Sequence, residues 1–176
     1  GMDRIAGQIG AGGRLYPGDE PFDRRQIDMG DGHRVYVEQF GHPAGRPVMV
    51  LHGGPGGDCS PFMRRFFDPA HYRVVLFDRR GCGRSTPRAS VVRNTTTHLV
   101  EDIEAIRTTL DLGRVLLFGG SWGATLALAY AQARPEAVAG LILRGVFLGR
   151  QRELDWFYGG GAARFFPELW ARFLAP

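Results

Sequence analysis

Ser121 is the residue whose sequence context points most directly to chemistry. It is the central residue of a Gly-x-Ser-x-Gly motif over residues 119–123. An apolar run, 115–118, precedes the motif and a stretch rich in alanine and leucine follows it, which is typical of a strand, a sharp turn and a helix. A serine at the apex of such a turn can act as the nucleophile of an acyl transfer. The motif therefore predicts that Ser121 is a catalytic nucleophile.

The other residues of the motif also have predicted roles. Gly119, Gly120 and Gly123 form the nucleophile elbow in this interpretation. Gly119 and Gly123 lack the Cβ atoms that would collide where the strand and the helix approach each other closely. The helix expected to begin at Trp122 directs its first amide groups toward the site, so the Trp122 N–H is predicted to stabilise an oxyanion.

A second glycine-rich stretch, 52–57, follows the apolar run 48–51. Its glycines let backbone N–H groups approach a ligand oxygen, and the Gly54 N–H is predicted to be the second oxyanion donor. His52 is interpreted as a structural hydrogen-bonding residue. A role for His52 as catalytic base stays open, because all five histidines of the sequence precede Ser121.

A third loop, 78–85, begins with Asp78 after the apolar run 73–77. The Asp78 carboxylate is expected to organise this turn by accepting hydrogen bonds from backbone amides and a nearby arginine, while a catalytic-acid role would lack a partner. Ligand sites of open α/β sheets lie at the carboxyl ends of the strands, and all three loops fall at such ends. The three loops are therefore predicted to converge on one site.

The order of predicted elements indicates an α/β fold of the α/β-hydrolase type. Two N-terminal strands joined by the Gly30-Asp31-Gly32 turn make an antiparallel start, and the rest of the sheet is expected to be mostly parallel. Strands are predicted at 22–28, 33–40, 48–51, 73–77, 115–118 and 141–143, and helices at 61–67, 94–110 and 122–134. The segment 154–174 is aromatic and amphipathic, and it is predicted to form further helices.

Composition sets further bounds on the 176 residues. With 44% hydrophobic and 23% charged residues, a globular domain is expected. The net charge of +4 comes from scattered arginines, which does not predict nucleic-acid binding. Neither a membrane-spanning stretch nor a signal-peptide core is present, so a cytoplasmic location with reduced Cys59 and Cys82 is expected. No metal-ligand spacing is found.

Three motifs together carry a family resemblance. They are H-G-G-P-G-G at 52–57, D-R-R-G-C-G-R-S-T-P at 78–87 and G-G-S-W-G-A-T-L-A-L-A-Y at 119–130. The chain resembles the proline iminopeptidases (prolyl aminopeptidases) of the α/β-hydrolase superfamily from about Leu15 onward. The usual D-Q-R-G of that family is D-R-R-G here, and this departure at Arg79 is not expected to touch the nucleophile.

The resemblance implies removal of an N-terminal proline from peptides, without a metal or an organic cofactor. Ser121 would attack the carbonyl, and the Gly54 and Trp122 amides would form the oxyanion hole. Family members continue into a helical cap and then carry the triad Asp and His, in the order Ser…Asp…His. By this comparison 1–149 is the N-terminal part of the hydrolase core, truncated after about the sixth strand, and 150–176 is the start of the cap or a swapped segment.

A chain without the triad acid and base is expected to be inactive alone, with only the residual catalysis of roughly 10³–10⁴ over water that binding and an oxyanion hole supply. Strand 141–143 would then be a sheet edge, which predicts a homodimer through edge pairing or exchange of 150–176. Two alternatives remain open. One is a non-catalytic binding or assembly module derived from the family, and the other is a different α/β-hydrolase, such as an esterase, completed by a partner chain.

Overall fold

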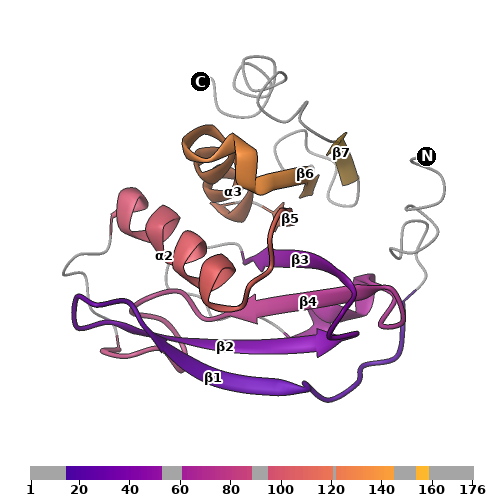
Figure 1. Cartoon of the computed structure of the whole chain (residues 1–176), viewed down its shortest axis with the longest axis horizontal. Coiled ribbons are helices and arrows are strands. Elements are labelled where there is room, and N and C mark those ends of the chain that lie inside the picture. Colours follow the sequence, from indigo (N-terminus) through magenta and orange to yellow (C-terminus); the bar gives the residue numbers. More distant parts are fainter. Residues whose placement is uncertain (1–14, 53–60, 89–94, 121, 145–153, 159–176) are drawn as a thin grey trace.

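A seven-stranded mixed sheet is the framework of the protein (Figure 1). The structure, a computed structural model, describes residues 15–52, 61–88, 95–120, 122–144 and 154–158. The strand order is β1-β2-β4-β3-β5-β6-β7. The strands are β1 (Asp23–Asp28), β2 (Arg34–Gly41), β3 (Arg46–Leu51), β4 (Tyr72–Phe77), β5 (Val115–Gly120), β6 (Val138–Arg144) and β7 (Leu154–Tyr158).

The central strands β4, β3, β5 and β6 are parallel neighbours, while β1, β2 and β7 run antiparallel to the strands they pair with. Side chains on both faces of the central strands are buried, as expected for short apolar runs in a parallel sheet. The predicted fold class, an α/β-hydrolase-type sheet with an antiparallel start, is confirmed.

Helices cover the two faces of the sheet unequally. Helices α2 (Thr96–Thr109) and α3 (Trp122–Ala133) lie side by side over one face, where the larger apolar cluster of the core is found (Figure 1). The 3-10 helix η1 (Pro61–Phe66) contributes side chains to the apolar cluster of the other face, and a second 3-10 turn, η2 (Pro135–Ala137), precedes β6. No helix among the described residues is long and apolar enough to span a bilayer.

The turn between β1 and β2 has the geometry that its glycines predict. Gly30 and Gly32 have φ values of 82° and 88°, which a residue with a Cβ rarely adopts. The Asp28 carboxylate accepts a hydrogen bond from the Gly30 amide at 2.8 Å, and Asp31 accepts one from the His33 amide at 3.2 Å. The turn therefore holds Asp31 in a defined place beside the sheet.

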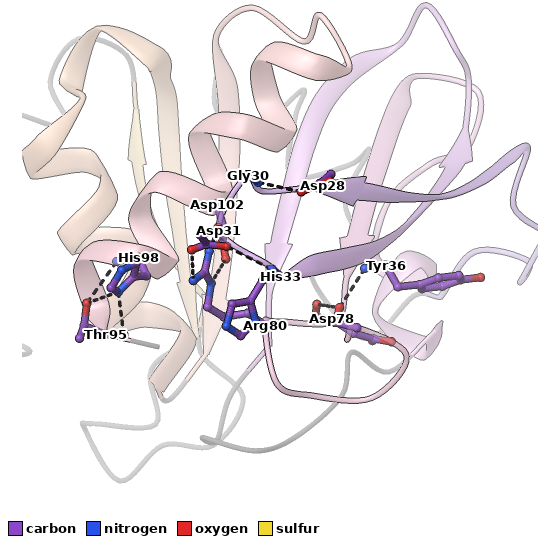
Figure 2. Close-up of polar contacts among 11 residues, drawn as sticks. Asp28, Gly30, Asp31, His33, Tyr36, Asp78, Arg80, Thr95, His98 and Asp102 are labelled. Carbon is purple, nitrogen blue, oxygen red and sulfur yellow. Dashed lines mark hydrogen bonds and ion pairs between the residues drawn. The ribbon is translucent and has the colours of Figure 1, made fainter. Parts of the chain in front are cut away.

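Helix α2 begins at a capping box. The Thr95 hydroxyl accepts from the His98 amide at 3.3 Å, and the His98 ring accepts from the Thr95 amide at 3.3 Å (Figure 2). The apolar spacing predicted for this helix is confirmed, since the face bearing Ile103 and Ile106 is fully buried against the sheet.

The structure differs from the sequence prediction at residues 154–158. The sequence predicts a helix there, but these residues form β7, antiparallel to β6. Aromatic residues favour strands, and the free edge of β6 offers a row of backbone hydrogen-bonding groups, so pairing is the physical alternative to a helix. Strand 141–143 is therefore not a sheet edge, and the predicted pairing of two chains through it loses its basis. The homodimer and the division at residue 149 stay predictions.

Ile103→Ala tests how far the α2 interface stabilises the fold. Because the side chain is fully buried, we expect the free energy of unfolding to fall by about 2–5 kcal/mol. Thr109→Ala, at an exposed position of the same helix, is the control and should change it by no more than about 0.5 kcal/mol. Urea unfolding of both variants measures the difference, and equal effects would contradict the proposed packing.

Candidate active site

The strands that precede the three predicted loops all end on the same side of the sheet. Strands β4, β3 and β5 are neighbours and run parallel, so their carboxyl ends, Phe77, Leu51 and Gly120, point the same way. His52 follows β3 directly, and Asp78 follows β4. The strand ends from which the three loops start lie together, as the sequence predicts.

Gly119 and Gly123 allow the start of α3 to lie against the ends of β5 and β3. A Cβ atom on Gly119 would lie 2.6 Å from the carbonyl carbon of Gly123, and one on Gly123 would lie 2.9 Å from the carbonyl carbon of Leu51. Neither glycine has a positive φ, so the requirement is close backbone approach and not chain conformation. The expected close approach is therefore present.

Ser121 is the single residue between Gly120, the last residue of β5, and Trp122, the first of α3. Its own placement and that of Gly54 lie outside the described residues, as do those of Cys59 and of 159–176. The strand and the helix that flank the serine are those that the motif predicts.

Arg79 lies between two of the loops. Its Nε donates to His52 Nε2 at 3.3 Å, and its guanidinium carbon is 5.3 Å from the centre of the Trp122 ring. His52 and Arg79 are only 6% and 4% exposed. His52 thus has the structural hydrogen bond that the sequence predicts. Arg79, which was not expected to touch the nucleophile, contacts the residue directly after Ser121, a contact that nothing in the sequence indicated.

Asp78 organises its loop as predicted. The buried carboxylate accepts hydrogen bonds from the Arg84 amide at 3.0 Å and from Arg84 Nε at 2.8 Å. The Ser85 hydroxyl donates to the Asp78 carbonyl oxygen and accepts from the Tyr36 amide. Burial alone would lower the pKa of Arg84, but the hydrogen bond to Asp78 and the charges of Asp78 and Glu38 raise it. The loop is therefore tied to β2 by a permanently charged group.

Arg80 ties the same loop to two other elements (Figure 2). Its Nε and Nη2 each donate to the Asp102 carboxylate of α2 at 2.6 Å, and Nη1 donates to Asp31 at 2.7 Å. Burial raises the pKa of Asp102 by more than the Arg80 contact lowers it. Burial would also raise the pKa of Asp31, but hydrogen bonds from Arg80 and the His33 amide outweigh it and lower that pKa.

Sequence reasoning missed this ion-pair cluster, although a signal for it exists. Asp102 lies three residues after Leu99 and four before Ile106, which places a carboxylate on the apolar face of the helix. A buried carboxylate needs a partner, and its partner is the second arginine of the 78–85 loop.

This fold and the strand–serine–helix segment define an α/β hydrolase. The family model described as alpha/beta hydrolase fold matches residues 46–171, and the chain belongs to that family. It is 56% identical over 161 residues to the proline iminopeptidase of Xylella fastidiosa, covering 92% of this chain and 51% of that one. Over 159 residues it is 55% identical to the proline iminopeptidase of Arabidopsis thaliana, covering 90% and 42%.

A solved structure gives the same comparison. The proline iminopeptidase-related protein of Thermus thermophilus matches with a TM-score of 0.59 and 32% identity, over 69% of this chain and 43% of that one. The resemblance to proline iminopeptidases found in the motifs is confirmed by these matches. The chain spans about half the length of the curated relatives it matches.

Gly123→Ala tests the close approach of α3 to β3. Helix propensity alone would make this change stabilising by up to about 1 kcal/mol. The collision with the Leu51 backbone predicts the opposite sign, a loss of about 1–3 kcal/mol in the free energy of unfolding. Gln132→Gly and Gln132→Ala, at an exposed position of α3, measure propensity without a collision. Stabilisation by Gly123→Ala would contradict the geometry.

Asp102→Ala tests the ion-pair cluster. Arg80 would keep its ion pair with Asp31 but lose the carboxylate that accepts two of its hydrogen bonds, while remaining buried. We therefore expect the free energy of unfolding to fall by about 3 kcal/mol. Glu101→Ala is a matched control, because the neighbouring Glu101 forms an exposed pair with Arg134 at 3.3 Å and should cost less than about 1 kcal/mol. Thermal and urea unfolding compare the two, and a cost for Asp102→Ala as small as that of the control would rule out a stabilising role.

Proposed function

We propose that this chain carries the nucleophile and the oxyanion hole of a serine-type prolyl aminopeptidase, which releases N-terminal proline from peptides. The observation that carries the proposal is the segment from β5 through Gly119, Ser121 and Gly123 to α3, with Gly123 packed against the end of β3. The identity of 50–56% to proteins named proline iminopeptidase supports the substrate class.

In this reaction the Ser121 Oγ attacks the carbonyl carbon of the N-terminal proline, and the serine proton passes to a general base. The carbonyl oxygen becomes an oxyanion that accepts hydrogen bonds from the Trp122 and Gly54 amides, aided by the positive end of the α3 dipole. Collapse of the intermediate expels the peptide amine, which takes up the proton. Water then hydrolyses the prolyl ester in a second round, releasing proline and regenerating Ser121.

We assign the general base to a residue other than His52. Nε2 of His52 accepts a hydrogen bond from Arg79, so the proton of the neutral ring is on Nδ1. The one lone pair that could take the serine proton is therefore already engaged. In α/β hydrolases the triad Asp and His follow the serine in the chain. We place both in the portion of the relatives' length that these 176 residues do not span. The 176 residues alone are then expected to have at most residual activity.

Ser121→Ala in the complete protein tests the proposal. Loss of the nucleophile should lower kcat/KM for proline p-nitroanilide by at least about 10³-fold. Thr109→Ala removes a hydroxyl from an exposed position at the end of α2, outside the loops after β3, β4 and β5, and its kcat/KM should stay within about twofold of the original. The release of p-nitroaniline measures both.

Two outcomes would overturn the assignment. Undiminished activity of Ser121→Ala would exclude this serine as nucleophile. If the protein hydrolysed simple esters but not proline p-nitroanilide, its assignment as a serine hydrolase would stand and its assignment as an aminopeptidase would be rejected. N-acetylated proline p-nitroanilide adds a check on the free amino group, since an aminopeptidase should leave the blocked substrate intact.

A further inference from the structure

Arg79 contacts residues that come from two different elements of the proposed site. On one side lies His52, directly after β3, and on the other lies Trp122, the first residue of α3. We propose that Arg79 is a positioning residue, which holds the start of α3 against the end of β3. It thereby fixes the orientation of the Trp122 amide, which donates a hydrogen bond to the oxyanion. This inference rests on the proposed function only for the role of that amide.

The two contacts use different parts of one guanidinium. The edge of the group donates through Nε to His52 Nε2 at 3.3 Å. The guanidinium carbon lies 5.3 Å from the centre of the Trp122 indole ring. A planar, permanently charged group can donate at its edge and interact with a ring at the same time, which an ammonium cannot do in the same way. Since Arg79 is only 4% exposed, water screens these contacts little.

Trp122 is thereby held from two directions. Its backbone neighbour Gly123 lies against the Leu51 carbonyl, which fixes the helix start along the sheet. The contact with Arg79 restrains the half-buried indole side chain, which the packing of the Gly123 backbone against Leu51 does not restrain. An amide that binds charge present only in the transition state must be oriented before the reaction, because reorientation would cost part of its stabilising effect.

The expected signature is a change in kcat and not in KM, because the oxyanion exists only after the attack. In the complete protein, Arg79→Met removes both contacts, and kcat for proline p-nitroanilide should fall about tenfold while KM stays within about twofold. Arg79→Gln keeps an N–H donor for His52 and should recover to within about threefold of the original kcat.

Arg64→Met is the matched control. The Arg64 guanidinium lies 5.2 Å from the centre of the Phe40 ring, a contact of the same kind and length outside the proposed site. Its loss should leave kcat unchanged. If Arg79→Met does not fold, Arg79→Lys replaces it, because a compact ammonium keeps the charge but cannot donate to His52 and lie over the Trp122 ring together, so kcat should again fall. Wild-type kcat in Arg79→Lys would then overturn the inference.

Hydrogen–deuterium exchange separates the inference from the proposed function. Exchange of the amides in 119–126 should be faster in Arg79→Met than in the unchanged protein, and Arg79→Gln should restore part of the protection. Failure of the unchanged protein to cleave proline p-nitroanilide would defeat the proposed function but leave this exchange result as support for positioning. Unchanged exchange in Arg79→Met, or an unchanged kcat in an active protein, would overturn it.

Discussion

The rest of the site depends on one close approach, that of the first turn of α3 to the carboxyl ends of β3 and β5. There is no room for a Cβ atom at Gly119 or Gly123, so backbone meets backbone where most helices would meet a strand through side chains. This approach brings the N-terminus of α3 to the backbone of Leu51 and His52 at the end of β3. The oxyanion hole that we propose needs that proximity, because two donors from separate loops must reach one oxygen atom.

Three arginines of the loop after β4 connect this junction to the rest of the fold. Arg79 reaches His52 and Trp122, Arg80 reaches Asp31 and Asp102, and Arg84 reaches Asp78 and Glu38. Each arginine joins the loop to other parts of the structure: Arg79 to α3, Arg80 to α2 and the β1–β2 turn, and Arg84 to β2. A buried ion pair such as Arg80–Asp102 contributes little net stability while paired and costs much when one partner is removed, so it fixes geometry more than it adds stability. The loop after β4 is therefore a central support of the site.

Much of the fold was predictable because its local signals agree with its tertiary contacts. The apolar runs of β3, β4 and β5, the spacing of Ile103 and Ile106, and the Gly30–Gly32 turn each have one structure that suits them. The prediction was wrong at 154–158, where a segment rich in aromatic residues suits a helix or a strand equally. The exposed edge of β6, a feature that exists only once the sheet has formed, determines its pairing as β7.

For the candidate site, the sequence by itself determined the chemical class and the steric requirement. The Gly-x-Ser-x-Gly motif between an apolar run and a helix indicates a nucleophile, and glycines at 119 and 123 are needed wherever that turn is tight. Only the tertiary structure decided the partners of Arg79, Arg80 and Asp102. Each of these residues is 22 or more positions from its partner in the chain. Spacing along a helix or strand reports which face a side chain occupies, but not which distant group the packing of the sheet brings against it.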